Sequence, residues 1–168
     1  VTIIDHTYYP PLHPHLTLVI STIKPKNLEL VIQKVTEIGI NRLIITETRY
    51  SQLSLRDIKK KYTRFQTIAT EACKQAQRPY LLDLQIMPLA DIPRSSQNYV
   101  ATTQAEDLPP LLTPKTHIDQ SLFIGPEGGF ALQDYEHLSD FSPVRLTPYI
   151  LRSETAAIVG SGLLRHLS

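Results

Sequence analysis

The chain of 168 residues contains a single cysteine, Cys73, and no long apolar run. One cysteine permits neither an internal disulfide nor a cysteine-based metal site, as is typical of a protein from the reducing cytoplasm, and we expect no bound metal. A membrane-spanning helix needs about 18 consecutive apolar residues, so none is predicted. Residues 1–15 also lack the basic start and apolar stretch of a signal peptide.

Methionine is equally scarce, because Met87 is the only one and the chain begins at Val1. The first residues, Val-Thr-Ile-Ile, are typical of the end of a strand. We therefore expect that a segment preceding this sequence has been removed.

The chain also has almost no net charge, with 17 lysines and arginines against 16 acidic residues. Bulk charge alone therefore does not indicate a nucleic-acid partner. The cations are nevertheless concentrated in one stretch, which predicts either a phosphate-binding face or a merely solvated one: Arg56, Lys59, Lys60, Lys61, Arg64, Lys74 and Arg78.

Hydrophobic residues make up 42% of the chain, which suits one globular domain with a real core. Apolar patterning and turn residues predict alternating strands and helices. The strands are expected at 16–23, 43–46, 82–86, 99–102, 121–124 and 144–146, and the helices at 25–38, 55–77, 131–138 and from a Ser153 cap onward. This alternation predicts an α/β fold, a mostly parallel sheet with helices on both faces.

Glycine is sparse, and three of the six glycines lie in Gly125-Pro-Glu-Gly-Gly129, between a buried strand and a helix. In an open α/β sheet, ligands bind beyond the carboxyl ends of the strands, and glycines allow the backbone to approach them closely. The simpler alternative is a tight connection without a ligand. Pro126 and the two adjacent glycines favour a binding site.

The turn matches neither a Walker A loop nor a dinucleotide fingerprint, because it lacks the Lys-Ser/Thr pair and the GxGxxG spacing. Glu127 would repel a phosphate and would suit a cationic ligand without phosphate, such as the sulfonium S-adenosylmethionine (AdoMet). Favourable placement of a carboxylate near a helix N-terminus explains Glu127 equally well.

A second segment, Leu146–Ala156, reads Leu-Thr-Pro-Tyr-Ile-Leu-Arg-Ser-Glu-Thr-Ala. Backbone groups of such a loop can bind an adenine edge while Ile150 and Leu151 cover its faces, and free N–H groups follow at the helix start. Alternatively, Arg152 and Glu154 form a surface ion pair of little energetic value.

Together, Ile124–Phe130 and Ile150–Ala156 resemble the paired motifs of the RsmE family of SPOUT RNA methyltransferases. The stretches Glu71–Arg78 and Leu30–Gly39 are similar to two further motifs of that family, and the resemblance extends from about Leu16 onward. Two positions depart from the family pattern: Thr147, where glycine is usual, and Tyr149, where arginine is usual.

The resemblance implies a C-terminal deep trefoil knot, a homodimer, and AdoMet bound within the knot. It also implies that residues 16–168 form the SPOUT domain and that residues 1–15 are the remnant of an N-terminal PUA-like domain and its linker. The cofactor-binding residues that it implies are Thr102, Thr103, Ile124, Gly125, Pro126, Glu127, Gly128, Gly129, Leu146, Tyr149, Ile150, Leu151, Thr155 and Ala156.

The activity implied is methylation of uridine N3 in small-subunit (16S) ribosomal RNA, acting on the RNA or the small ribosomal subunit. Arg152 and Glu154 are the catalytic candidates, with Arg152 stabilising a carbonyl oxygen of the base. Contacts to RNA are expected from Lys24, Lys34, Gln75 and Arg78, although helix-end capping explains Gln75 and Arg78 equally well.

Three other functions remain open at this point. The first is another SPOUT methyltransferase, acting on transfer RNA or on a ribose 2′-oxygen. The second is a non-catalytic RNA-binding module, which the departures at Thr147 and Tyr149 would suit. The third is a phosphate-binding enzyme, against which Glu127 counts.

Overall fold

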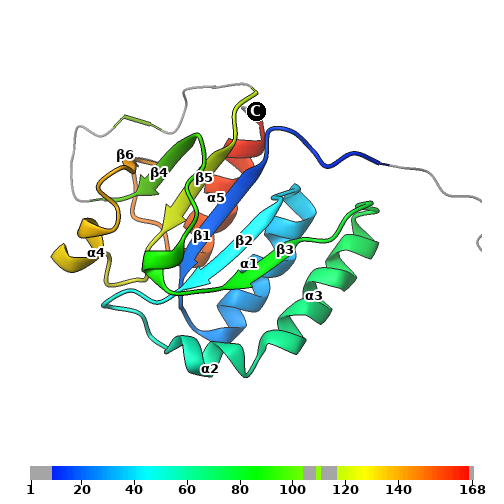
Figure 1. Ribbon diagram of the computed structural model, residues 1–168, viewed down its shortest axis with the longest axis horizontal. Helices are drawn as coiled ribbons and strands as arrows, with labels where there is room; N and C mark the ends of the chain where they lie inside the picture. Colours follow the sequence, from blue (N-terminus) through cyan, green and yellow to red (C-terminus); the bar gives the residue numbers. More distant parts are fainter. Residues whose placement is uncertain (1–8, 104–108, 111–116, 167–168) are drawn as a thin grey trace, which may run out of the picture.

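Six parallel strands form one sheet in the computed structural model, which describes residues 9–103, 109–110 and 117–166 (Figure 1). The strand order is β3-β2-β1-β5-β4-β6, and every adjacent pair is parallel. The strands are β1 Leu16–Ser21, β2 Arg42–Thr46, β3 Asp83–Ile86, β4 Gln97–Ala101, β5 Gln120–Ile124 and β6 Ser142–Val144. The predicted parallel α/β sheet is therefore confirmed.

The helices are α1 Pro25–Ile38, α2 Leu55–Lys59, α3 Tyr62–Gln75, α4 Leu132–Glu136 and α5 Ser153–His166, with a short 3₁₀ turn, η1, at Leu89–Asp91. The central strands β1 and β5 are buried at every position, and their side chains alternate between two cores. Leu18, Ile20 and Leu122 pack in the larger core with α1, α3 and α5, while Val19 and Phe123 pack in the smaller core with α4. Helices thus lie on both faces, as predicted.

The long helix predicted at 55–77 is wrong, because the structure divides it into α2 and α3. Lys61 has φ −100° and ψ 2°, and its N–H bonds the carbonyl of Ile58, three residues back. The chain therefore turns tightly at Lys60 and Lys61. Ile58 and Phe65 are both fully buried, so the apolar spacing continues across this break.

Two smaller predictions also need correction. Ser153 is the first residue of α5 rather than its cap, because the Arg152 carbonyl already accepts the Ala156 N–H (2.8 Å). The helix predicted at 131–138 is shorter and spans Leu132–Glu136.

The trefoil knot and the domain boundary at residue 15 stay predictions. The knot depends on the path between β4 and β5, and most of that connection, residues 104–108 and 111–116, lies outside the described residues. Residues 1–8 of the predicted remnant lie outside them too. Residues 9–15 run to the start of β1, where the Leu12 N–H donates to the Tyr80 hydroxyl (3.2 Å).

Candidate functional site

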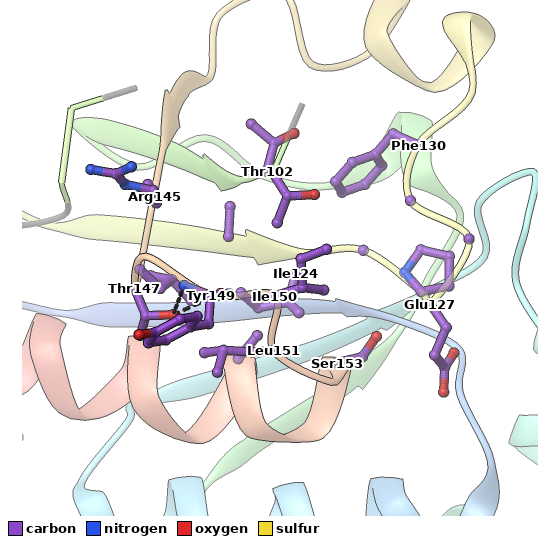
Figure 2. A pocket seen from close by; sticks show the side chains of 18 residues that line it. Thr102, Ile124, Glu127, Phe130, Arg145, Thr147, Tyr149, Ile150, Leu151 and Ser153 are labelled. Carbon is purple, nitrogen blue, oxygen red and sulfur yellow. Dashed lines mark hydrogen bonds between the residues drawn. The ribbon is translucent and has the colours of Figure 1, made fainter. Parts of the chain in front are cut away.

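A cavity of about 240 Å³ opens at the carboxyl ends of β4 and β5 (Figure 2). Three segments surround it: residues 101–103 after β4, 124–130 after β5, and 145–151 after β6, with the first turn of α5 closing the base. Parallel strands bring their carboxyl ends to one edge of a sheet, which is where α/β proteins bind ligands. The cavity therefore lies where the sequence predicted a site.

The glycine-rich turn forms one wall and requires its glycines. Gly129 has φ +72°, in the left-handed region that favours glycine, and its N–H donates to the Pro126 carbonyl (2.9 Å). A Cβ on Gly125 would lie 2.9 Å from the ring of Phe130. That ring is buried and makes an edge contact with Phe123, so it cannot move aside cheaply.

The loop after β6 forms the opposite wall. The Thr147 hydroxyl donates to the Tyr149 carbonyl (2.8 Å) and accepts the Tyr149 N–H (3.3 Å), as the dashed lines in Figure 2 show. The Thr147 side chain therefore stabilises this loop by hydrogen bonds to the backbone of Tyr149. The side chains of Tyr149 and Ile150 line the cavity and are also 81% and 84% exposed, so this wall faces solvent on its outer side.

Charged side chains are few in the cavity lining. Glu127 and Arg145 are the only charged residues among the described residues that line it, and Figure 2 shows them at opposite ends. The Glu127 carboxylate accepts a hydrogen bond from the Gln52 amide (2.9 Å). Among the described residues no lysine lines the cavity, so this part of the chain does not supply the cation cluster that a polyphosphate would need.

All but one of the predicted cofactor-binding residues line this cavity. The exception is Thr155, which is exposed on the first turn of α5. The sequence analysis missed five lining residues, Ala101, Phe130, Arg145, Thr147 and Ser153. Phe130 and Ser153 lie within the two motifs themselves, so taking every residue of each motif as cofactor-binding would have included them.

The catalytic candidates lie at the start of α5 without lining the cavity. Arg152 is exposed between Leu151 and Ser153, which both line it. The Oε2 atom of Glu154 is buried without a hydrogen-bond partner among the described residues. No ion pair joins Arg152 and Glu154 among the described contacts, so the surface-pair alternative has no support.

The four RNA candidates have different surroundings. Lys24 is exposed just before α1 and makes no ion pair among the described residues, whereas Lys34 pairs with Glu37 (2.9 Å). Gln75 is exposed at the end of α3.

Arg78 caps the C-terminal end of α1. Its guanidinium donates to the carbonyls of Thr36 (3.0 Å) and Ile40 (2.7 Å) and lies over the Tyr80 ring, 4.7 Å from its centroid. Burial lowers the pKa of this side chain, the direction expected for a cation removed from water. These contacts favour the helix-capping alternative for Arg78 over a phosphate contact.

We expect Arg78→Ala to lower the free energy of unfolding by about 2 kcal/mol, because two part-buried carbonyls lose a charged donor. Urea denaturation of the variant and of Lys74→Ala, whose side chain pairs only with exposed Glu71, measures this. The control should change stability by less than about 0.5 kcal/mol. Equal, small effects in both variants would contradict the capping role.

None of the described helices is long and apolar enough to cross a bilayer. Within the same part of the chain, no group of three or more histidine, cysteine or acidic side chains could hold a metal ion.

Two sequence relatives match most of the chain. The ribosomal RNA small subunit methyltransferase E of Buchnera aphidicola (subspecies Acyrthosiphon pisum) is 31% identical over 94% of this chain and 64% of its own length. The same-named protein of Aquifex aeolicus is 31% identical over 82% of this chain and 62% of its own length. The chain thus spans somewhat less than two thirds of these relatives.

Among solved structures, a methyltransferase of Legionella pneumophila in complex with bound S-adenosylmethionine superposes with a TM-score of 0.78. It is 28% identical, over 93% of this chain and 66% of its own. The sequence model of a family described as "RNA methyltransferase domain" matches residues 10–165. The resemblance inferred from the two loop motifs is confirmed, and the chain belongs to this family of RNA methyltransferase domains.

Proposed function

We propose that this chain binds AdoMet in the cavity and transfers its methyl group to N3 of a uridine in small-subunit (16S) ribosomal RNA. One observation carries the proposal: the glycine-rich turn and the loop after β6, the two segments of the paired motif, enclose a single cavity. The relatives named for methylation of small-subunit ribosomal RNA support the choice of substrate.

The lining fits AdoMet in shape and charge. The cofactor has no phosphate, and no lysine is found among the described residues of the cavity lining. Gly125 and Gly128 let the turn pack closely against Phe130 and Tyr50, while Ile150 and Leu151 offer aliphatic surface to an adenine. The Glu127 carboxylate can attract the positively charged end of the cofactor. When bound, AdoMet supplies an electrophilic methyl group on its sulfonium.

The remaining chemistry falls to side chains of this chain. N3 of uridine carries a proton between two carbonyls, so removing that proton leaves negative charge on the carbonyl oxygens. Arg152, exposed beside the cavity, is the proposed donor that stabilises one of these oxygens. One carboxylate oxygen of Glu154 is buried and has no hydrogen-bond partner among the described residues. We propose that the bound substrate or Arg152 donates a hydrogen bond to this oxygen.

The target uridine must leave any paired helix before its N3 can react, because pairing occupies that atom. The cavity is open to solvent beside Tyr149 and Ile150, which are largely exposed. We propose that a second copy of this chain covers this wall, giving a homodimer with each site near the interface. We also place the protein in the cytoplasm, where the small ribosomal subunit is found.

Calorimetric titration of this chain with AdoMet tests the proposal at its first step. We expect saturable binding at one site per chain and weaker binding for adenosine alone, because adenosine lacks the charged end. GTP, which carries a triphosphate, should produce no binding. The proposal would be contradicted if AdoMet gave no heat of binding, or if the chain bound GTP more tightly than AdoMet.

A further inference from the structure

Exposed cations without an ion pair are concentrated at one end of the molecule. Along the described parts of the chain, Lys34, Arg64 and Lys74 each pair with a glutamate, and Lys60 pairs with Asp57. Seven exposed cations make no ion pair among the described residues, and all lie at or just beyond the carboxyl ends of the strands or where the adjoining helices begin: Lys24, Lys26, Arg49, Arg56, Lys59, Lys61 and Arg152.

Specific contacts connect these cations to the cavity. The loop between β2 and α2, residues 47–54, meets the end of β1, where Thr22 donates through its hydroxyl to the Leu53 carbonyl. Lys24 and Lys26 lie two and four residues after Thr22, and Arg56 and Lys59 lie three and six residues after Leu53. The same loop reaches the glycine-rich turn through the hydrogen bond between Gln52 and Glu127 (2.9 Å). Figure 1 shows this loop, α2 and the start of α1 together at one end of the sheet.

Asp134 holds the other side of the loop. Its buried carboxylate accepts the backbone N–H of Arg49 (3.1 Å) and that of Ala131 (2.8 Å), at the start of α4. The backbone of residue 49 is therefore fixed next to the helix that follows the glycine-rich turn. The Arg49 side chain remains exposed and makes no ion pair with a carboxylate of the described residues.

Tyr50 places an aromatic ring in the middle of this region. A Cβ on Gly128 would lie 3.0 Å from the Cβ and 3.4 Å from the Cγ of Tyr50, so this side chain rests on the glycine-rich turn. It is nevertheless 53% exposed. An exposed aromatic face flanked by cations is the combination with which proteins bind single-stranded nucleic acid.

We propose that these seven cations and Tyr50 form the RNA-binding surface of this chain, here called the carboxyl-end surface. Arg152 acts on the target base as proposed above, the other six cations bind phosphates on either side of the target nucleotide, and Tyr50 stacks on a base next to the cavity. This inference rests on the proposed function for the presence of RNA. It differs from the phosphate-binding face expected along residues 56–78, because Arg64 and Lys74 of α3 are paired and Arg78, which follows α3, caps α1.

The test measures binding of a single-stranded oligouridylate by fluorescence anisotropy over a range of salt concentrations. The variant Lys24→Ala/Arg56→Ala/Lys59→Ala should reduce the slope of log affinity against log salt by about 2, at roughly 0.7 per phosphate contact on a single strand. The control Lys34→Ala/Arg64→Ala/Lys74→Ala removes the same charge and the same residue types from paired positions, and its slope should match the wild type. If both triple variants changed the salt dependence of binding equally, the proposal of the carboxyl-end surface would be wrong.

Tyr50 is tested separately. Tyr50→Ala should weaken binding on the order of tenfold without changing the salt slope, while Tyr50→Phe retains affinity because it keeps the stacking ring. Tyr9→Ala is the matched control, since Tyr9 is 59% exposed and precedes β1 at the opposite end of the sheet. Similar losses for Tyr9→Ala and Tyr50→Ala, or no loss for Tyr50→Ala, would overturn the stacking role.

A parallel titration with AdoMet separates this inference from the proposed function. If AdoMet binds but the two triple variants behave alike, the carboxyl-end surface is wrong and the cofactor assignment stands. If the triple variants differ as expected but AdoMet does not bind, the surface stands and the methyltransferase proposal is wrong.

Discussion

Arg152→Ala should lower methyl transfer by about 10²–10³-fold, the loss typical of removing one donor to a developing oxyanion. Arg152 is exposed beside the cavity without lining it, so its loss should leave the affinity for AdoMet unchanged. Single-turnover methylation of small-subunit ribosomal RNA measures the rate, and calorimetry measures the affinity.

Arg152→Lys is the matched variant, because lysine keeps the charge but lacks the planar guanidinium fork. We expect it to recover part of the lost rate. Wild-type turnover in Arg152→Ala, or a parallel fall in AdoMet affinity, would contradict the proposed catalytic role and assign Arg152 to cofactor binding.

Gly125→Ala is the second variant for which we expect a large effect, in this case on AdoMet affinity. The new methyl group would lie 2.9 Å from the ring of Phe130, which packs edge-on against Phe123 and close to Tyr135. Either this aromatic group or the turn must shift, and overpacking of this kind costs about 1–3 kcal/mol. Because Gly125 also lines the cavity, we expect AdoMet affinity to fall at least about tenfold, a free-energy change of about 1.4 kcal/mol.

Gly162→Ala is its control. No atom lies within 4 Å of the position that a Cβ would occupy there, and the residue is inside α5. Replacing a helical glycine by alanine should stabilise the chain by about 0.5–1 kcal/mol and leave AdoMet binding intact. Calorimetry and thermal unfolding of both variants make the comparison. Unchanged affinity in Gly125→Ala would show that this turn does not shape the cofactor pocket.

The central strands were predicted well because buried strands are rich in apolar residues, which can be recognised in the sequence. β1 and β5 are buried at every position and contain more apolar than polar residues, so both were recognised as buried strands. The end of α1 was equally visible, since Gly39 has the positive φ of a left-handed cap.

The break between α2 and α3 could not be predicted from apolar spacing. Ile58, Tyr62 and Phe65 keep helical intervals, and Lys60 and Lys61 are good helix formers. The turn instead lets the Tyr62 hydroxyl donate to the Leu84 carbonyl in edge strand β3 (3.1 Å). That is a tertiary contact, and it has no counterpart in the local sequence.

The two motifs predicted most of the residues that line the cavity, but they did not predict all of them. Arg145 and Ala101 lie on neighbouring strands of the sheet or directly after them, and their approach depends on β6 pairing with β4. That pairing is non-local and carries no motif. For Arg78 the sequence left RNA contact and helix capping open, and its hydrogen bonds to the carbonyls at the end of α1 favour capping.

The most direct test of the central claim is the identity of the methylated nucleoside. Unmodified small-subunit ribosomal RNA is incubated with this chain and isotope-labelled AdoMet, digested to nucleosides and analysed by mass spectrometry against standards. We predict label in 3-methyluridine, with none formed by Arg152→Ala on the same time scale. Label in a 2′-O-methylated ribose or in another base, or no transfer by a chain that binds both AdoMet and RNA, would contradict the account.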